Sequence, residues 1–221
     1  MLRISLKGVL AAVLLLGVTS ANAVLIDFIT MADANEAGHN PLVISFSSVT
    51  LSITGHASDD DDNAQFAYLD SGNAGLGACK DVTGSAQCAP SNDDNVTTNE
   101  WLEFVFSEDV IIDNLWANNN HDGGFSSGDL ITIAGTDYAA VKGDHSSGSD
   151  LRTDLAGNFA TGPGGWLVSA NTVFEVAYNN TQFYVAALEV QTVPEPNMLL
   201  LFALGLGLIV VVKSSKPAVI A

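Results

Sequence analysis

The chain has 221 residues, and its 25 aspartates and glutamates outnumber its 7 lysines and arginines, giving a formal net charge of −18. This lack of basic surface excludes a nucleic-acid-binding protein, because phosphate recognition needs clustered positive charge. A hydrophobic content of 48% argues against wholesale disorder, and two cysteines are too few for a disulfide-dense miniprotein. A polytopic membrane protein is excluded because repeated long apolar runs are missing from the sequence.

The first 23 residues are typical of a secretory signal peptide. Arg3 and Lys7 form a basic segment, and residues 9–18 form an apolar one. Ala21 and Ala23 then supply the small side chains that signal peptidase accepts before its cleavage point. We therefore expect export and cleavage after Ala23. The alternative, a retained N-terminal anchor, is disfavoured because the apolar run is short.

Between residues 24 and 193, short segments rich in β-branched and aromatic residues alternate with turn-forming residues, and no helical period is visible. The expected strands are residues 24–29, 43–54, 65–70, 101–106, 110–116, 130–134, 138–142, 166–169, 172–178 and 182–190. This pattern predicts one all-β domain, an antiparallel β-sandwich of jelly-roll type.

Two of these segments have the period of two that marks a strand with one buried and one wet face. In residues 49–54, Val, Leu and Ile alternate with Thr and Ser. In residues 101–106, Glu103 is expected to face outward among apolar neighbours. Trp101 and Trp116 lie inside strand segments and are expected to pack in the core.

Cys79 and Cys88 close a loop of about ten residues, and the signal peptide places them in an oxidising compartment. We expect a disulfide that stabilises the fold by slightly under ~3 kcal/mol. The alternative is a catalytic or metal-binding thiol pair. It is disfavoured because the spacing is not that of a redox Cys-x-x-Cys motif and no histidine is close in sequence.

Two acidic loops are candidate cation sites, because clustered carboxylates supply the oxygen ligands that Ca²⁺ prefers. The preferred site combines Asp93, Asp94 and Asn95 with Glu100 at the start of a strand. The other is residues 59–63, where the glycine that an EF-hand requires is missing. For both loops the alternative is a solvated turn with local side-chain hydrogen bonds.

Trp166 follows a Gly- and Pro-rich loop and is the candidate for a partly exposed carbohydrate-binding platform. Trp116, Tyr138 and Tyr178 are weaker candidates, because such residues more often belong to the core. No catalytic residue is expected: the sequence has no Gly-x-Ser-x-Gly elbow, and its four histidines are dispersed. We therefore predict that the protein is not an enzyme and does not bind zinc.

The C-terminal part carries a second apolar block. Residues 198–212 are uncharged and predict a short transmembrane helix of ~22 Å, followed by Lys213 and Lys216. These lysines favour a cytoplasmic end for the helix and an exterior location for the domain. Just before the block, the prolines of Pro194-Glu195-Pro196 impose an extended backbone.

This arrangement resembles the PEP-CTERM sorting signal of exported proteins from Gram-negative bacteria that produce exopolysaccharide. The resemblance covers residues 194–221, although two lysines replace the usual arginine cluster. It implies recognition at Pro194, Glu195 and Pro196 by exosortase, a membrane-embedded transpeptidase-like enzyme, and removal of the tail. The alternative is an ordinary C-terminal anchor.

A second, internal pattern is similar to one found in PEP-CTERM ectodomains. It comprises residues 69–79, 93–95 and 100–106, where a Gly-Leu-Gly-Ala-Cys segment precedes an Asp/Asn loop and a strand similar to the pattern Glu-x-Leu-x-Leu-x-Phe. The resemblance implies a turn at residues 75–79 and a β-sandwich surface domain. It implies no activity.

Together these features divide the chain into a signal peptide (1–23), a secreted domain (24–193) and a sorting signal (194–221). The secreted domain keeps 24 acidic and three basic residues, a formal charge of −21. We expect a cell-surface or extracellular-matrix protein with a structural or adhesive, non-catalytic role alongside exopolysaccharide. The alternatives are a calcium-dependent carbohydrate-binding module and, third, a polysaccharide-modifying hydrolase.

Overall fold

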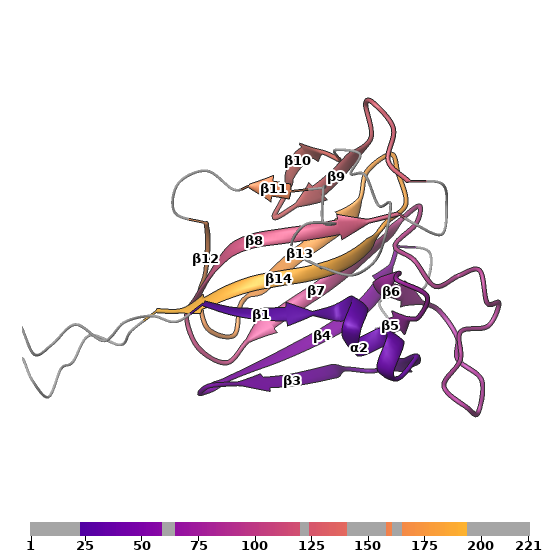
Figure 1. Ribbon diagram of the computed structural model, residues 1–221, viewed down its shortest axis with the longest axis horizontal. Coiled ribbons are helices and arrows are strands. Elements are labelled where there is room, and N and C mark those ends of the chain that lie inside the picture. Colours follow the sequence, from indigo (N-terminus) through magenta and orange to yellow (C-terminus); the bar gives the residue numbers. More distant parts are fainter. Residues whose placement is uncertain (1–22, 59–64, 120–123, 141–157, 161–164, 194–221) are drawn as a thin grey trace, which may run out of the picture. The chain divides into compact units, whose positions relative to one another are not determined.

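The segments rich in β-branched and aromatic residues form two antiparallel sheets, called sheet A and sheet B, that enclose an apolar core as a β-sandwich (Figure 1). The computed structural model describes residues 23–58, 65–119, 124–140, 158–160 and 165–193. All of them belong to one compact unit, Asn22–Val193. The prediction of an all-β sandwich is confirmed.

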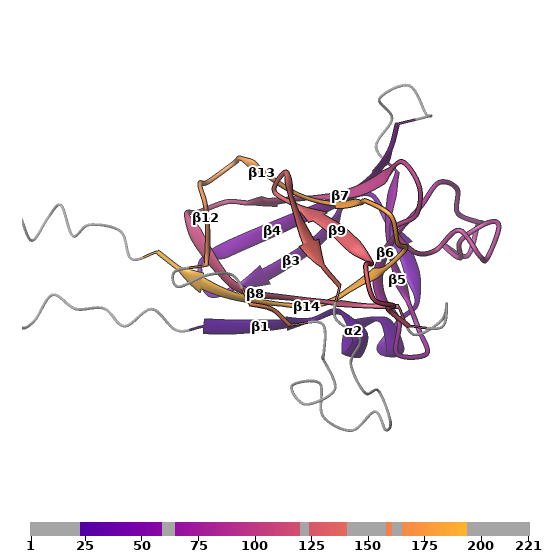
Figure 2. The same cartoon turned by 90° about the horizontal axis from the view of Figure 1, so that it is seen from above.

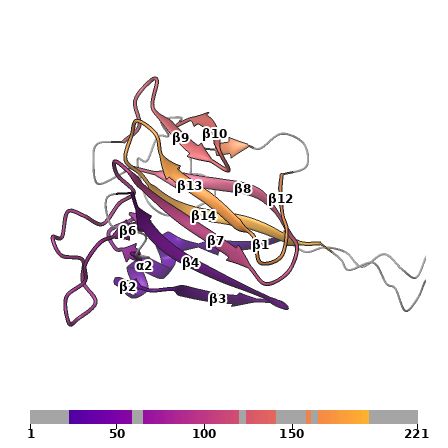
Figure 3. The ribbon, with the colours of Figure 1, turned by 180° about the vertical axis from the view of Figure 1, so that it is seen from behind.

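Within the described ranges, sheet B has six strands in the order β10-β9-β13-β7-β4-β3. Their bounds are β3 (Leu42–Phe46), β4 (Val49–Ala57), β7 (Glu100–Phe106), β9 (Leu130–Ile133), β10 (Thr136–Ala139) and β13 (Val173–Tyr178). Figure 3 shows β13, β7, β4 and β3 as neighbours in this layer.

Sheet A has eight strands in the same described ranges, with β11-β8-β14-β6-β5-β2 as its main order. Their bounds are β1 (Ala23–Asp27), β2 (Ala37–His39), β5 (Phe66–Asp70), β6 (Gly75–Cys79), β8 (Val110–Asn118), β11 (Asn158–Ala160), β12 (Trp166–Val168) and β14 (Tyr184–Thr192). Figure 2 shows β8, β14 and β1 in one layer and β3, β4 and β7 in the other.

β14 is the strand on which sheet A is organised. One of its edges pairs with β8 from Tyr184 to Thr192. Its other edge is shared, since β6 pairs at Val185 and β1 pairs from Ala187 to Gln191. β14 is therefore held by hydrogen bonds on both edges.

Strands β4 and β7 have the alternating burial that their sequences predict. In β4 every second residue from Val49 to Ala57 is buried, and in β7 every second residue from Glu100 to Phe106 is buried. Glu103 faces outward as expected. The buried side chains from this layer meet those of sheet A in one apolar cluster. Its largest fully buried members are Phe28, Leu51, Ile53, Leu76, Leu102, Phe104, Phe106, Ile112, Leu115 and Phe183.

The two ends of the described domain lie side by side. Ala23, the first residue of β1, is paired with Gln191 near the end of β14. The last described residue, Val193, donates its backbone N–H to the carbonyl oxygen of Asp109 at 3.1 Å. Both ends of the domain therefore leave the sandwich at the same place (Figure 1).

The prediction that the domain contains no helix is wrong. The expected strand at residues 24–29 ends at Asp27, where α2 (Phe28–Ala34) begins. The Asp27 carboxylate caps the helix, because it accepts hydrogen bonds from the Thr30 N–H at 2.8 Å and from the Thr30 hydroxyl at 2.7 Å. A helix of seven residues is too short for a period of 3.6 to stand out in the sequence.

Two further expectations need correction. Residues 43–54, predicted as one strand, form the β3–β4 hairpin, with Ser47 at a φ of 50° in its turn. The turn implied at residues 75–79 is instead strand β6, which is buried throughout. Gly77 serves close packing there, because a Cβ on it would collide with the carbonyl oxygen of Asp94.

Candidate functional site

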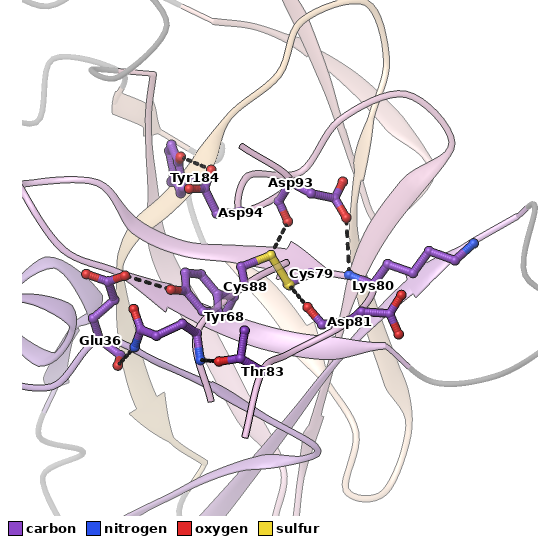
Figure 4. The surroundings of a disulfide bond; sticks show 11 residues. Glu36, Tyr68, Cys79, Lys80, Asp81, Thr83, Cys88, Asp93, Asp94 and Tyr184 are labelled. Carbon is purple, nitrogen blue, oxygen red and sulfur yellow. Dashed lines mark hydrogen bonds between the residues drawn. A yellow bond between two sulfur atoms is a disulfide. The ribbon is translucent and has the colours of Figure 1, made fainter. Parts of the chain in front are cut away.

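Cys79 and Cys88 form the predicted disulfide, with Cα atoms 5.9 Å apart (Figure 4). Cys79 is the last residue of β6, and the bond holds the following loop against the outer side of sheet A. Both cysteines pack in a small apolar cluster with Tyr68, flanked by Phe66 and Val82. The disulfide therefore secures a cover on one face of the sandwich.

The four predicted calcium ligands are close in sequence, but their hydrogen bonds go to separate partners. Asp93 accepts from the backbone N–H of Lys80 at 3.4 Å, and Asp94 accepts from the Tyr184 hydroxyl at 2.8 Å (Figure 4). Glu100 accepts from the backbone N–H of Thr97 at 2.9 Å, and Asn95 is buried. Since Tyr184 is far from Asp94 in sequence, the bond between them fastens the loop to β14, which the alternative of a solvated turn with only local bonds does not include.

In the ranges that the structure describes, no group of three or more His, Cys, Asp or Glu side chains is arranged to hold a metal ion. Calcium binding through Asp93, Asp94, Asn95 and Glu100 stays a prediction. The other acidic loop, residues 59–63, lies outside the described residues.

Two buried tyrosines fasten the segments that cover sheet A. Tyr184 donates to Asp94 at 2.8 Å, and Tyr68 donates to Glu36 at 2.7 Å. Burial, and then the hydrogen bond to a carboxylate, raises the pKa of each phenol well above its usual range. Both hydroxyls therefore remain protonated donors at neutral pH, and each holds a carboxylate at the sheet.

Trp166, the predicted sugar platform, is half-buried and belongs to an aromatic group beside the core. Its ring meets Tyr138 edge to face with centroids 5.8 Å apart, and meets Phe174 in the same way at 5.6 Å. Trp116 is buried, while Tyr138 and Tyr178 pack against the core. Carbohydrate binding by Trp166 stays a prediction.

Trp101 is the side chain whose place sequence reasoning missed. It is half-buried on the outer face of sheet B rather than packed in the core, and its ring stacks on that of His56 with centroids 5.4 Å apart. The signal was present, because Trp101 is two residues from outward-facing Glu103 and alternate residues of a strand share a face.

Hydrogen bonds hold this outer group in place. The Trp101 indole N–H donates to Oε1 of Glu103 at 3.1 Å, and Nε2 of His56 lies 3.3 Å from Oε2 of the same carboxylate. His56 Nε2 also lies 2.9 Å from the Thr54 hydroxyl. Glu175 of β13 is paired in register with Glu103 of β7, so two carboxylates face each other across neighbouring strands.

Several predicted sites lie outside the described residues. They are the signal peptide, the sorting motif Pro194, Glu195 and Pro196, and the apolar block at residues 198–212. No helix in the part of the chain that the structure describes is long and apolar enough to cross a membrane.

The chain was compared with known proteins at three levels. No protein-family model matches it, and neither a curated protein nor a solved structure does.

Proposed function

We propose that this protein is exported, sorted through a PEP-CTERM signal by exosortase, and displayed at the surface or in the matrix of a Gram-negative bacterium. Its jelly-roll-type sandwich is a structural or adhesive component associated with exopolysaccharide and has no catalytic role. The signal peptide at residues 1–23 directs export. Residues 194–221, with the transmembrane helix at 198–212, hold the chain in the membrane until the tail is removed.

The observation that carries this proposal is the pairing of the two ends of the domain. Val24, the first residue after the expected cleavage point, lies opposite Val190 in the β1–β14 pair, and Val193 donates its backbone N–H to the carbonyl oxygen of Asp109. The first residue of the proposed mature chain and the residue before the proposed sorting motif therefore lie at one end of the sandwich. Pro194 of the sorting motif follows Val193 directly. This arrangement suits a domain that is attached to the membrane at one end and points its other end away from it.

The disulfide loop lies toward the other end of sheet A. Leu76 of β6 pairs with Val185 at the start of β14, whereas Ala23 pairs near the end of that strand (Figure 1). A disulfide is the usual reinforcement of exported domains, because it forms and persists outside the reducing cytosol. The formal charge of −21 for residues 24–193 favours solubility outside the cell.

The proposal is tested by expressing the full chain in a Gram-negative host with and without an exosortase. We expect loss of the tail, seen by intact mass, and release from the membrane fraction only when the enzyme is present. Glu195→Ala should block processing, whereas the neighbouring control Asn197→Ala should not. Equal processing of the Glu195→Ala variant and the unaltered chain would overturn the sorting assignment.

A further inference from the structure

Three parallel rows of side chains cross the outer face of sheet B. The first row, Val43, Ser52, Val105 and Val173, is mainly apolar. The second contains Thr54, Glu103 and Glu175, and the third contains His56, Trp101, Ala177, Thr132 and Asp137. We call these three rows the outer platform.

The apolar row is unusual for its exposure. Val43 is 57% exposed and Val173 is 55% exposed, and both are among the few large hydrophobic side chains that the described surface leaves open. Exposed apolar side chains that gather on one face mark an interaction surface more often than scattered ones do. The flat face of sheet B is therefore a candidate contact surface.

The third row places the Trp101 ring beside a residue with a small side chain. Trp101 stacks on His56 at one side, while its partner in register on the other side is Ala177, whose side chain is a single methyl group. Beyond Ala177, the Thr132 hydroxyl donates to Asp137 at 2.8 Å and accepts from Asn179 at 3.2 Å. The Trp101 ring, the Thr132 hydroxyl and the Asp137 carboxylate thus belong to one row across the strands. Five strands at ~4.8 Å spacing span about 19 Å, a length that suits an oligosaccharide rather than a single sugar.

The second row carries two carboxylates, which favour a ligand with positive charge. Glu103 and Glu175 are paired in register, and like charges in this position repel each other. The six strands of sheet B contain no Lys or Arg that could offset them. His56 lies 3.3 Å from Glu103, whose side chain is still 27% exposed. A cationic group placed between the two carboxylates would relieve the repulsion and would also lie near the indole ring, which attracts cations.

From this combination we infer that the outer platform binds a polysaccharide whose sugars carry free amino groups. The sugar rings pack on Trp101 and on the apolar row, and the ammonium groups pair with Glu103 and Glu175. Charge complementarity selects this ligand over acidic polymers, which the carboxylates repel. The inference rests on the proposed association with exopolysaccharide, and it adds the chemical class of the polymer.

The test uses the purified full chain and two hexasaccharides that differ only in acetylation, a β-1,4-linked glucosamine hexamer and its N-acetylated form. Calorimetric titration should show saturable binding of the amine form and at least tenfold weaker binding of the acetylated form. Glu175→Gln and Trp101→Ala should each weaken binding of the amine form by tenfold or more. A thermal unfolding curve for each variant separates lost binding from lost folding, and Glu175→Gln preserves side-chain shape.

Glu108→Gln is the matched control, because it removes one exposed carboxylate from the turn between β7 and β8, which is not part of the three rows. It should leave binding unchanged. The inference is overturned if both hexamers bind equally, if neither binds, or if Glu108→Gln weakens binding as much as Glu175→Gln. Tail processing is scored separately in cells, so a failure of the platform is distinguishable from a failure of the sorting proposal.

Discussion

The two sheets of this sandwich differ in how many side chains their strands bury. In sheet B, strands β4 and β7 bury every second side chain and expose the others. In sheet A, β6 is buried along its whole length and β5 nearly so. The difference lies in what covers the outer side, since the loop after Cys79 packs on sheet A.

This difference shows how a covering loop changes the residues that a strand needs. Gly77 of β6 lies under the backbone of Asp94, where even a methyl group would collide. Tyr68 of β5 packs on the outer side with the disulfide rather than in the main core. A strand covered on both faces has neither a wet face nor an alternating sequence.

The largest expected effect concerns the sheet with one covered face. Phe104→Ala removes a fully buried ring from the inner face of β7 and should lower the free energy of unfolding by about 3–5 kcal/mol. Its neighbour Val105 points to the outer face, so Val105→Ala should change stability by ~0.5 kcal/mol or less. Urea denaturation of the two variants measures the contrast. Equal losses would mean that the two faces of β7 are not distinct.

The next effect concerns the cover of sheet A. Replacing both Cys79 and Cys88 by alanine should lower the free energy of unfolding by slightly under ~3 kcal/mol, because the open chain gains conformational entropy when unfolded. Reduction of the unaltered protein should cause a similar loss, and reduction of the double variant should cause none. If reduction left the urea midpoint unchanged, the disulfide would not be what secures this loop.

The smallest effect concerns one hydrogen bond within that cover. Tyr184→Phe leaves Asp94 without its phenol donor and should cost about 1–3 kcal/mol at neutral pH. Tyr178→Phe on sheet B, where no such carboxylate bond is removed, should cost less. If Tyr184→Phe lowered the free energy of unfolding no more than Tyr178→Phe does, other contacts would hold Asp94 in place.

The Tyr184→Phe variant also gives a test against pH. Burial, and then its hydrogen bond to Asp94, raises the pKa of Tyr184 in the folded state above the value near 10 of an unfolded tyrosine. Its contribution to stability is therefore complete below about pH 10 and is lost as the pH rises above that value. Stability should fall more steeply above pH ~10 in the unaltered protein than in Tyr184→Phe. Equal slopes in a urea series would contradict this assignment.

The same contrast explains what could be predicted from the sequence. Alternation in residues 49–54 and 101–106 identified strands of sheet B and the outward direction of Glu103, because one face of that sheet is wet. The disulfide was predicted from the short spacing between Cys79 and Cys88 and from the oxidising compartment that the expected signal peptide implies. In sheet A, β6 could not be recognised, because its glycines are required by close contacts with distant segments: Gly77 lies against the backbone of Asp94, and Gly75 against that of Val185.

The candidate sites divide along similar lines. The proposed sorting motif needs no fold to be recognised, since Pro194, Glu195 and Pro196 are contiguous in the sequence. The outer platform could not, because Glu103 and Glu175 meet only through the pairing of β7 with β13. Register between strands distant in the chain is set by packing, and no local pattern encodes it.

The position of β14 has a mechanical consequence. If the domain is held at Val193, as the proposed sorting implies, the drag of flowing medium passes through β14, which ends at Thr192. Because β14 is bonded along both edges, by β8 on one side and by β1 and β6 on the other, a pull along its axis loads many hydrogen bonds at once in shear. A strand at the edge of a sheet would share such a load with only one neighbour.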